Sequence, residues 1–443
     1  MPRSLRSGRE AQPTVRDTGS TRFAHVALKT GLVYLFVPLT AFLTGPVLAR
    51  VLGPDDRGLL AGVLAPIALA SLFMSFGLPE ATTYFTARFP ASRRRLAIVG
   101  CGAGLAVGLV AVAVLHAYAA VAISDPFGQD LVRDLSWLLP PLLGLAALRA
   151  ALMGSGRFSV VNVERSVGAL ARLGAVVALA VTGTLTVASA AWATEATFLA
   201  VALIIILPAA VRLFGDSTDR GPEVGEVLAY GLRVWPGVMA GVVLLRADQA
   251  IMLPLAGAEQ LGLYAVAVAI AEVLNLGVVA LRDVLMPTVS RAWNVDVLAR
   301  ATRCFIILMV PVVIAAIAVV PVGLPLLYGK DFAPAVPMAQ VLCLSALPFG
   351  LSLLMGAGLM AAGRPGLTSV VQGVSAVVAV TCLVLLLPVL GGMGAALVSL
   401  IAYSVGAVMS SFIFRATLGA SLGALVVPRR EDVAFLIGLV RRN

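Results

Sequence analysis

The sequence has few charged residues. Only 12% of its 443 residues are Asp, Glu, Lys or Arg, whereas 60% are hydrophobic, and the mean hydropathy is +1.02. Soluble globular domains carry about 25% charged and 45–50% apolar residues. This composition excludes a water-soluble globular protein and predicts an all-α polytopic membrane protein.

Residue types that hold metals, disulfides or nucleotides are also scarce. The two histidines, His25 and His116, lie in different regions, and the four cysteines fall singly within apolar runs without ligand spacing. No Gly-x-x-x-x-Gly-Lys motif is found. We therefore predict no metal site, no cofactor and no catalytic residues, and we do not expect an enzyme.

Long apolar runs follow one another through the sequence. A run of about 18 or more apolar residues can cross a hydrocarbon core of about 30 Å as a helix. Twelve membrane spans are predicted, at residues 26–49, 58–85, 96–121, 135–153, 166–187, 190–211, 227–255, 261–287, 304–328, 335–361, 367–388 and 392–414.

The basic residues lie mainly in alternate connecting segments. The net charge of +10 comes almost wholly from arginine. One set of segments between the spans holds only Arg50, Arg57, Arg133 and Lys330, whereas the other set holds most of the remaining basic residues. Basic segments stay in the cytoplasm, so we expect both termini there, in a bacterial cytoplasmic membrane. This distribution is typical of membrane topology and does not indicate nucleic-acid binding.

Two short motifs recur about half a chain apart. Residues 53–61 align with 257–265, an offset of 204, and residues 152–157 align with 359–364, an offset of 207. The duplication predicts two parallel six-helix lobes, at 26–214 and 227–414, joined by a polar cytoplasmic linker at 215–226. The flanking segments are expected to be a disordered basic tail (1–25) and an amphipathic tail on the inner leaflet (415–443).

Several ionisable residues lie within the predicted spans. An ionisable group at the bilayer centre costs about 2.5–3.5 kcal/mol on insertion scales, so it is expected to face protein or a wet cavity. Glu272, Asn275 and Arg282 fall within about 80° on one helical face. The substrate-binding cavity is predicted to contain Arg149, Arg172, Arg246, Arg282 and Asn275, with Asp248, Glu272 and Glu80 as coupling or charge-balancing residues.

The same residues have a structural interpretation. Each arginine could instead be neutralised by an acid on a neighbouring helix, which leaves no anion pocket. Glu195, near the outer start of its span, is interpreted as an interfacial residue.

The whole chain resembles the polysaccharide-transporter branch of the multidrug/oligosaccharidyl-lipid/polysaccharide exporter superfamily, the lipid-linked oligosaccharide flippases. The resemblance rests on residues 52–58, 246–249, 261–265, 327–332 and 363–364. It implies two MATE-like lobes that form a V and alternate between inward- and outward-facing states. It also implies a cationic cavity for a pyrophosphate-linked sugar, with the polyprenyl tail in lipid at a gap lined by spans one and eight.

Three functions are considered. The favoured one is a flippase for a lipid-linked oligosaccharide in surface polysaccharide synthesis, with membrane lipids and polysaccharide polymerases or glycosyltransferases as partners. A cation-coupled multidrug exporter of the same fold would need an acidic cavity. A membrane-embedded glycan polymerase or ligase would normally need a larger external loop than this sequence has.

Overall fold

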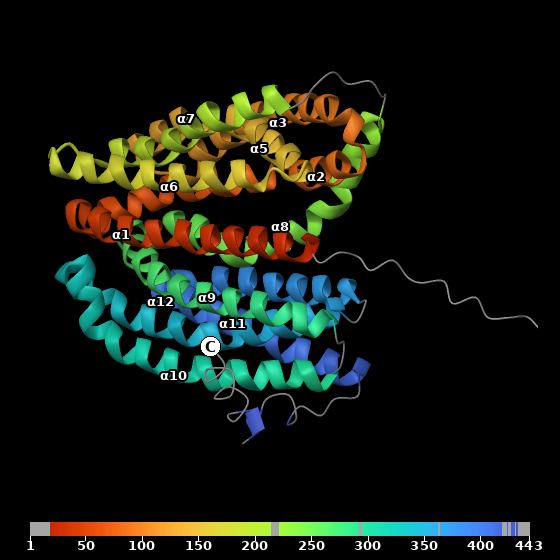
Figure 1. Ribbon diagram of the computed structural model, residues 1–443. Coiled ribbons are helices and arrows are strands. Elements are labelled where there is room, and N and C mark those ends of the chain that lie inside the picture. Colours follow the sequence, from red (N-terminus) through yellow and green to blue (C-terminus); the bar gives the residue numbers. More distant parts are fainter. Residues whose placement is uncertain are drawn as a thin grey trace, which may run out of the picture.

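The computed structural model describes residues 18–213, 221–291, 295–361, 364–418, 423, 427–429 and 431–432. Within these ranges, side chains are not described for residues 18–35, 213, 237–238, 240–247, 250, 280–291, 295, 297, 361, 365 and 417–418. The described chain is helical, as the sequence predicts (Figure 1).

The N-terminal half contains seven α-helices. They are α1 (Thr18–Phe73), α2 (Leu78–Arg88), α3 (Arg93–Ala122), α4 (Pro126–Ser136), α5 (Leu139–Gly154), α6 (Phe158–Val181) and α7 (Val187–Leu213), with a short 3-10 turn, η1 (Pro90–Ser92), before α3. Helix α1 begins at Thr18 and so extends into the segment expected to be a disordered tail.

The described part of the C-terminal half contains five long α-helices. They are α8 (Val224–Ala256), α9 (Ala258–Arg291), α10 (Val295–Tyr328), α11 (Val336–Ala361) and α12 (Pro365–Leu418), with the 3-10 segment η2 (Lys330–Ala335) before α11. Most of the predicted C-terminal tail, and residues 214–220 of the predicted linker, lie outside the described residues.

Two of the longest helices are each two helices joined at a glycine. Gly53 in α1 has φ 75° and ψ 178°, and Gly391 in α12 has φ 55° and ψ −138°. Residues other than glycine rarely adopt a positive φ. Glycine therefore allows the chain to change direction at these two positions. The predicted boundaries between spans one and two and between spans eleven and twelve fall at these glycines.

The described residues include seven helices long and apolar enough to cross a membrane, or up to eight if α4 and α5, which are bent by 42°, form one span. This count is lower than the predicted twelve because α1 and α12 each count once and because α5, α6 and α8 are not among the seven helices. The protein is thus a multi-pass membrane protein, and twelve spans remains a prediction.

In the described residues, the two copies of each repeated motif share a backbone feature. Gly257, at the α8–α9 turn, has φ 84° and ψ 171°, close to the values of its counterpart Gly53. In the second motif, the amide of Arg157 donates to the carbonyl of Leu152 and that of Arg364 donates to Leu359, both at 2.9 Å. The duplication seen in the sequence therefore has a counterpart in the local structure.

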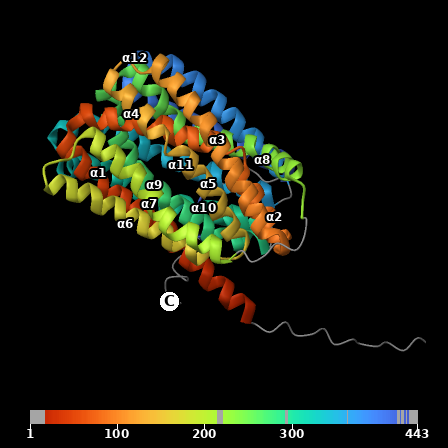
Figure 2. The ribbon, with the colours of Figure 1, turned by 90° about the horizontal axis from the view of Figure 1, so that it is seen from above.

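The N-terminal half lies above the C-terminal half in Figure 1, with α1 and α8 between them. The helices of both halves run in broadly the same direction in Figures 1 and 2. Helix α1 packs against α9, and α2 packs against α8. The helix bundle has one end that contains Gly53 and Gly257. We refer to it as the predicted outer end, because the predicted topology places these two loops outside the cytoplasm.

Glycines allow the two halves to touch through their backbones. A Cβ atom on Gly58 would lie 1.6 Å from the Ala258 carbonyl oxygen, and one on Gly262 would lie 2.0 Å from the Pro54 carbonyl oxygen. Because Gly58 and Pro54 are the repeat counterparts of Gly262 and Ala258, the contact is nearly symmetric. A second close approach joins Gly77 to Gly231, between α8 and the turn before α2.

Candidate functional site

The N-terminal half encloses a cavity of about 600 Å³ between α1, α2, α5, α6 and α7. Most of its wall is apolar, with Val37, Ile67, Leu139 and Leu143 among the lining residues. Its charged lining residues are Glu80, Arg149, Glu164, Arg165 and Glu195. Two predicted site residues, Glu80 and Arg149, therefore share one cavity.

Arg149 forms an ion pair with Glu164, a partner that was not predicted from the sequence. Its Nε donates to both carboxylate oxygens of Glu164 at 3.1 Å, and a terminal nitrogen donates to Oε1 at 2.7 Å. Glu164 is 2% exposed and the Arg149 side chain is 20% exposed. A bidentate pair of this kind matches the planar guanidinium well, so Arg149 is neutralised within the protein.

Arg172 lies beside two residues that line this cavity, Phe198 and Glu195. Its guanidinium carbon is 5.4 Å from the centre of the Phe198 ring, and the side chain interacts electrostatically with Glu195. Its Nε is buried without a hydrogen-bond partner in the described part of the chain. Glu195 thus lines the cavity beside a cation, and its interfacial position stays a prediction.

Glu80 lies near the N-terminus of the short helix α2. Gly77, in the left-handed region at φ 68°, precedes this helix, and Glu80 lies in its first turn. The positive end of a helix dipole favours a carboxylate at this position. Its Oε2 atom is buried and has no partner among the described residues, so this carboxylate has unused capacity to accept a proton or a donor.

A second group of predicted residues lies in the C-terminal half. Asp248 accepts a hydrogen bond from Tyr264, and the Gln249 amide donates to its Oδ1 at 2.8 Å. Glu272 is exposed, and Asn275 has a buried Oδ1 without a partner in the described region. The side chains of Arg246 and Arg282 lie outside the described residues, so their predicted place in the cavity stays a prediction.

The predicted residues therefore fall into two groups. Among the described residues, those that line the cavity belong to the N-terminal half, between Val37 and Phe198. With Arg172, which lies beside the lining residues Phe198 and Glu195, three arginines stand near three carboxylates. The predicted excess of arginine includes Arg246 and Arg282 and stays a prediction.

Two arginines, Arg50 and Arg57, lie at the boundary between the halves. From the sequence they were assigned only to a loop between predicted spans. Arg50 donates from Nε to the Leu327 carbonyl at 2.9 Å and from a terminal nitrogen to the Leu326 carbonyl, at the end of α10. Arg57 lies beside Tyr328, and both Arg57 Nε and Tyr328 Oη are buried without partners in the described part of the chain. The only sequence signal for Arg57 was its position within the repeated motif.

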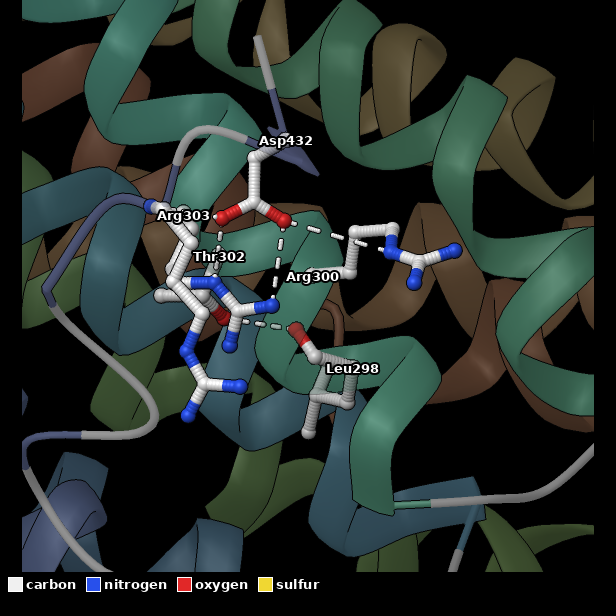
Figure 3. A network of polar contacts seen from close by, with 6 residues as sticks. Leu298, Arg300, Thr302, Arg303 and Asp432 are labelled. Atoms are coloured by element: carbon white, nitrogen blue, oxygen red, sulfur yellow. Dashed lines mark hydrogen bonds and ion pairs between the residues drawn. The ribbon is translucent and has the colours of Figure 1, made fainter. Parts of the chain in front are cut away.

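A separate polar cluster joins the C-terminal segment to α10 (Figure 3). Asp432, which is fully buried, accepts from Arg303 at 2.6 and 3.0 Å, while the nearest atoms of Arg300 and Asp432 are 3.9 Å apart. The Arg429 amide also donates to Asp432 at 2.9 Å. The hydrogen bond from Arg303 holds the pKa of Asp432 below its ordinary value.

The chain belongs to the polysaccharide biosynthesis protein family, whose model matches residues 27–293. None of the curated proteins matches the sequence. The fold is also found in solved structures of low sequence identity.

One such structure is the lipid II flippase MurJ in an inward closed conformation, with 11% identity, coverage of 93% of this chain and 92% of that chain, and a TM-score of 0.72. Another is an inward-facing multidrug resistance MATE transporter of the MOP superfamily, with 14% identity, coverage of 89% and 98%, and a TM-score of 0.68. A MOP superfamily transporter from Pyrococcus furiosus has 14% identity, coverage of 89% and 96%, and a TM-score of 0.63.

These findings confirm the family suggested by the sequence motifs and the MATE-like fold. The chain is a polysaccharide biosynthesis protein whose fold is similar to those of the MurJ and MATE structures.

Proposed function

We propose that the protein moves a polyprenyl-diphosphate-linked oligosaccharide across the bacterial cytoplasmic membrane for surface polysaccharide synthesis. The observation that carries this proposal is the family match over residues 27–293 of a chain with a transporter fold. The two halves would alternate between closure at the predicted outer end and closure at the opposite end. Both termini would be cytoplasmic, and polymerases or glycosyltransferases would use or supply the substrate.

The ion pair between Arg149 and Glu164 removes Arg149 from the proposed set of substrate-binding residues. A guanidinium already held by both oxygens of Glu164 has little capacity left for a phosphate. We therefore give Arg149 a structural role and keep Arg172, Arg246, Arg282 and Asn275 as candidate substrate contacts. Asp248, Glu272 and Glu80 remain candidates for coupling, with Glu80 supported by its partner-free oxygen inside the cavity.

Deletion of the gene tests the function. Cells without the protein should accumulate the lipid-linked oligosaccharide on the inner leaflet and lose surface glycan, and the wild-type gene should restore both. Unchanged surface glycan without accumulation of the lipid-linked oligosaccharide would contradict the proposal. Mass spectrometry of lipids that co-purify with the protein would identify the saccharide.

A cation-coupled drug exporter is the second candidate. It is favoured by the three carboxylates in or around the cavity, Glu80, Glu164 and Glu195. In that case Glu80→Gln should abolish resistance to cationic drugs while leaving surface glycan intact. The opposite pattern, loss of glycan without any change in drug resistance, supports the flippase.

A further inference from the structure

Two buried hydrogen-bond donors that are close enough to interact electrostatically lie at the boundary between the halves. Arg57 belongs to the first turn after the Gly53 bend in α1, and Tyr328 is the last residue of α10. Arg57 Nε and Tyr328 Oη are both buried and without partners among the described residues. Buried donors are normally satisfied, so two neighbouring exceptions point to an acceptor that binds from outside the protein.

The surroundings hold these donors in place. Tyr328 is 1% exposed, and α1 packs on it so closely that a Cβ on Gly45 would lie 3.2 Å from its hydroxyl oxygen. Arg50 fixes the end of α10 by donating to the carbonyls of Leu326 and Leu327. The tyrosine is therefore fixed between α10 and α1, with its hydroxyl group unused.

The local charge favours an anion over a cation. The acidic neighbours of Arg57, Asp55 and Asp56, are exposed, and no ion pair to Arg57 is found in the described part of the chain. On the other side, Glu272 of α9 is close enough to interact electrostatically with Tyr328. The guanidinium is thus an uncompensated cation, with one carboxylate beyond the tyrosine.

We infer that Arg57 and Tyr328 form a binding site for the diphosphate of the transported lipid, at the predicted outer end of the boundary between the halves. The inference rests on the proposed function and adds two residues to its substrate contacts. A guanidinium binds two phosphate oxygens at once, and the tyrosine hydroxyl donates to a third. Because α1 and α10 belong to different halves, the bound diphosphate would contact both halves.

The test measures binding of farnesyl diphosphate, with farnesol as the uncharged control, to the purified full chain in phosphatidylcholine nanodiscs. Arg57→Gln should weaken farnesyl diphosphate binding at least about tenfold, since it removes a charge-assisted contact, and should leave farnesol binding unchanged. Tyr328→Phe should weaken it by roughly twofold to tenfold. Glu272→Gln should strengthen it, because a nearby negative charge is removed. Arg133→Gln, at an exposed arginine paired with Asp130, is the matched control and should change nothing.

Thermal unfolding separates a ligand contact from a structural one. Because the buried Arg57 Nε lacks a partner, Arg57→Gln should keep or raise the unfolding temperature of the ligand-free protein. A lowered unfolding temperature with unchanged diphosphate binding would overturn the inference. So would failure of the wild-type protein to bind farnesyl diphosphate.

Two further experiments are needed. One identifies the source of the bound anion, and the other distinguishes failure of this inference from failure of the proposed function. If anionic phosphatidylglycerol in the nanodisc competes equally well, the site binds a lipid headgroup and the diphosphate assignment is wrong. If the Arg57→Gln protein restores surface glycan fully in the deletion strain, the inference fails while the flippase proposal stands. If even the wild-type gene has no effect on lipid-linked saccharide, the proposed function itself fails.

Discussion

Gly58 and Gly262 face each other across the boundary between the two halves, each pressed against the backbone of the other half. A Cβ on Gly58 would lie 2.8 Å from the Gly262 nitrogen, and one on Gly262 would lie 3.0 Å from the Gly58 nitrogen. These residues are counterparts in the internal repeat, so one motif used twice forms both sides of the contact. The contact closes the predicted outer end by direct packing of helix backbones.

Alanine at either glycine should disrupt this closure. Gly58→Ala would place its methyl group 1.6 Å from a carbonyl oxygen, so α1 and α9 must move apart. Overpacking of this kind costs about 1–3 kcal/mol, and the unfolding temperature of the purified protein should fall. Gly102→Ala is the matched control, because a Cβ there has no neighbour within 4 Å and alanine favours the helix. An equal effect of the two substitutions would contradict this account.

The pair of Arg149 and Glu164 should be structural. Glu164→Gln leaves a partly buried guanidinium without its partner, and breaking a buried pair costs about 3–5 kcal/mol. The double substitution Arg149→Met with Glu164→Leu should recover most of this loss, because no charge remains buried. Thermal unfolding measures both effects. If the double variant is stable yet cannot restore surface glycan in the deletion strain, Arg149 acts on the substrate and our structural assignment is wrong.

Glu80 should matter for transport more than for stability. Its Oε2 has no partner in the described region, so Glu80→Gln removes a charge without breaking a hydrogen bond to that atom. We expect an unchanged unfolding temperature and a loss of at least about tenfold in the response of transport to an imposed pH gradient in proteoliposomes. Glu226→Gln, at an exposed residue in the first turn of α8, should leave this response intact. Transport that keeps its pH response in Glu80→Gln would exclude Glu80 from coupling.

The contact of Asp432 with α10 should weaken only in acid. Because Arg303 lowers the pKa of Asp432 in the folded protein, its contribution to stability is fully present above the ordinary Asp pKa of about 3.9. It is lost as the pH falls through the lower folded pKa, since protonation removes the carboxylate that Arg303 binds. Asp432→Asn should therefore lower the unfolding temperature near neutral pH, and the difference from wild type should vanish in strong acid. Glu431→Gln, at the exposed neighbour, should show no such difference at either pH.

Some features could be predicted because they depend on local sequence. Apolar runs form helices in a membrane, since every backbone hydrogen bond must be satisfied within the segment. The repeated glycines at 53 and 257 gave similar turns, because a positive φ is a local property that glycine permits.

The partners of the charged residues could not be predicted in this way. Helical periodicity gives the face on which Arg149 lies, but it does not reveal that Glu164 of the next helix faces it. Asp432 and Arg303 are 129 positions apart, and only the packing of the C-terminal segment on α10 brings them together.

The sequence by itself therefore determined the membrane class, the family and the repeated halves, all of which follow from composition, motifs and local backbone preference. The tertiary structure decided which charges are neutralised and which donors lack partners. It placed Arg149 against a carboxylate, and it buried the Nε atom of Arg57, a predicted loop residue, near Tyr328 between the halves. The physical reason is that the charge balance of a buried group depends on the neighbours that helix packing supplies.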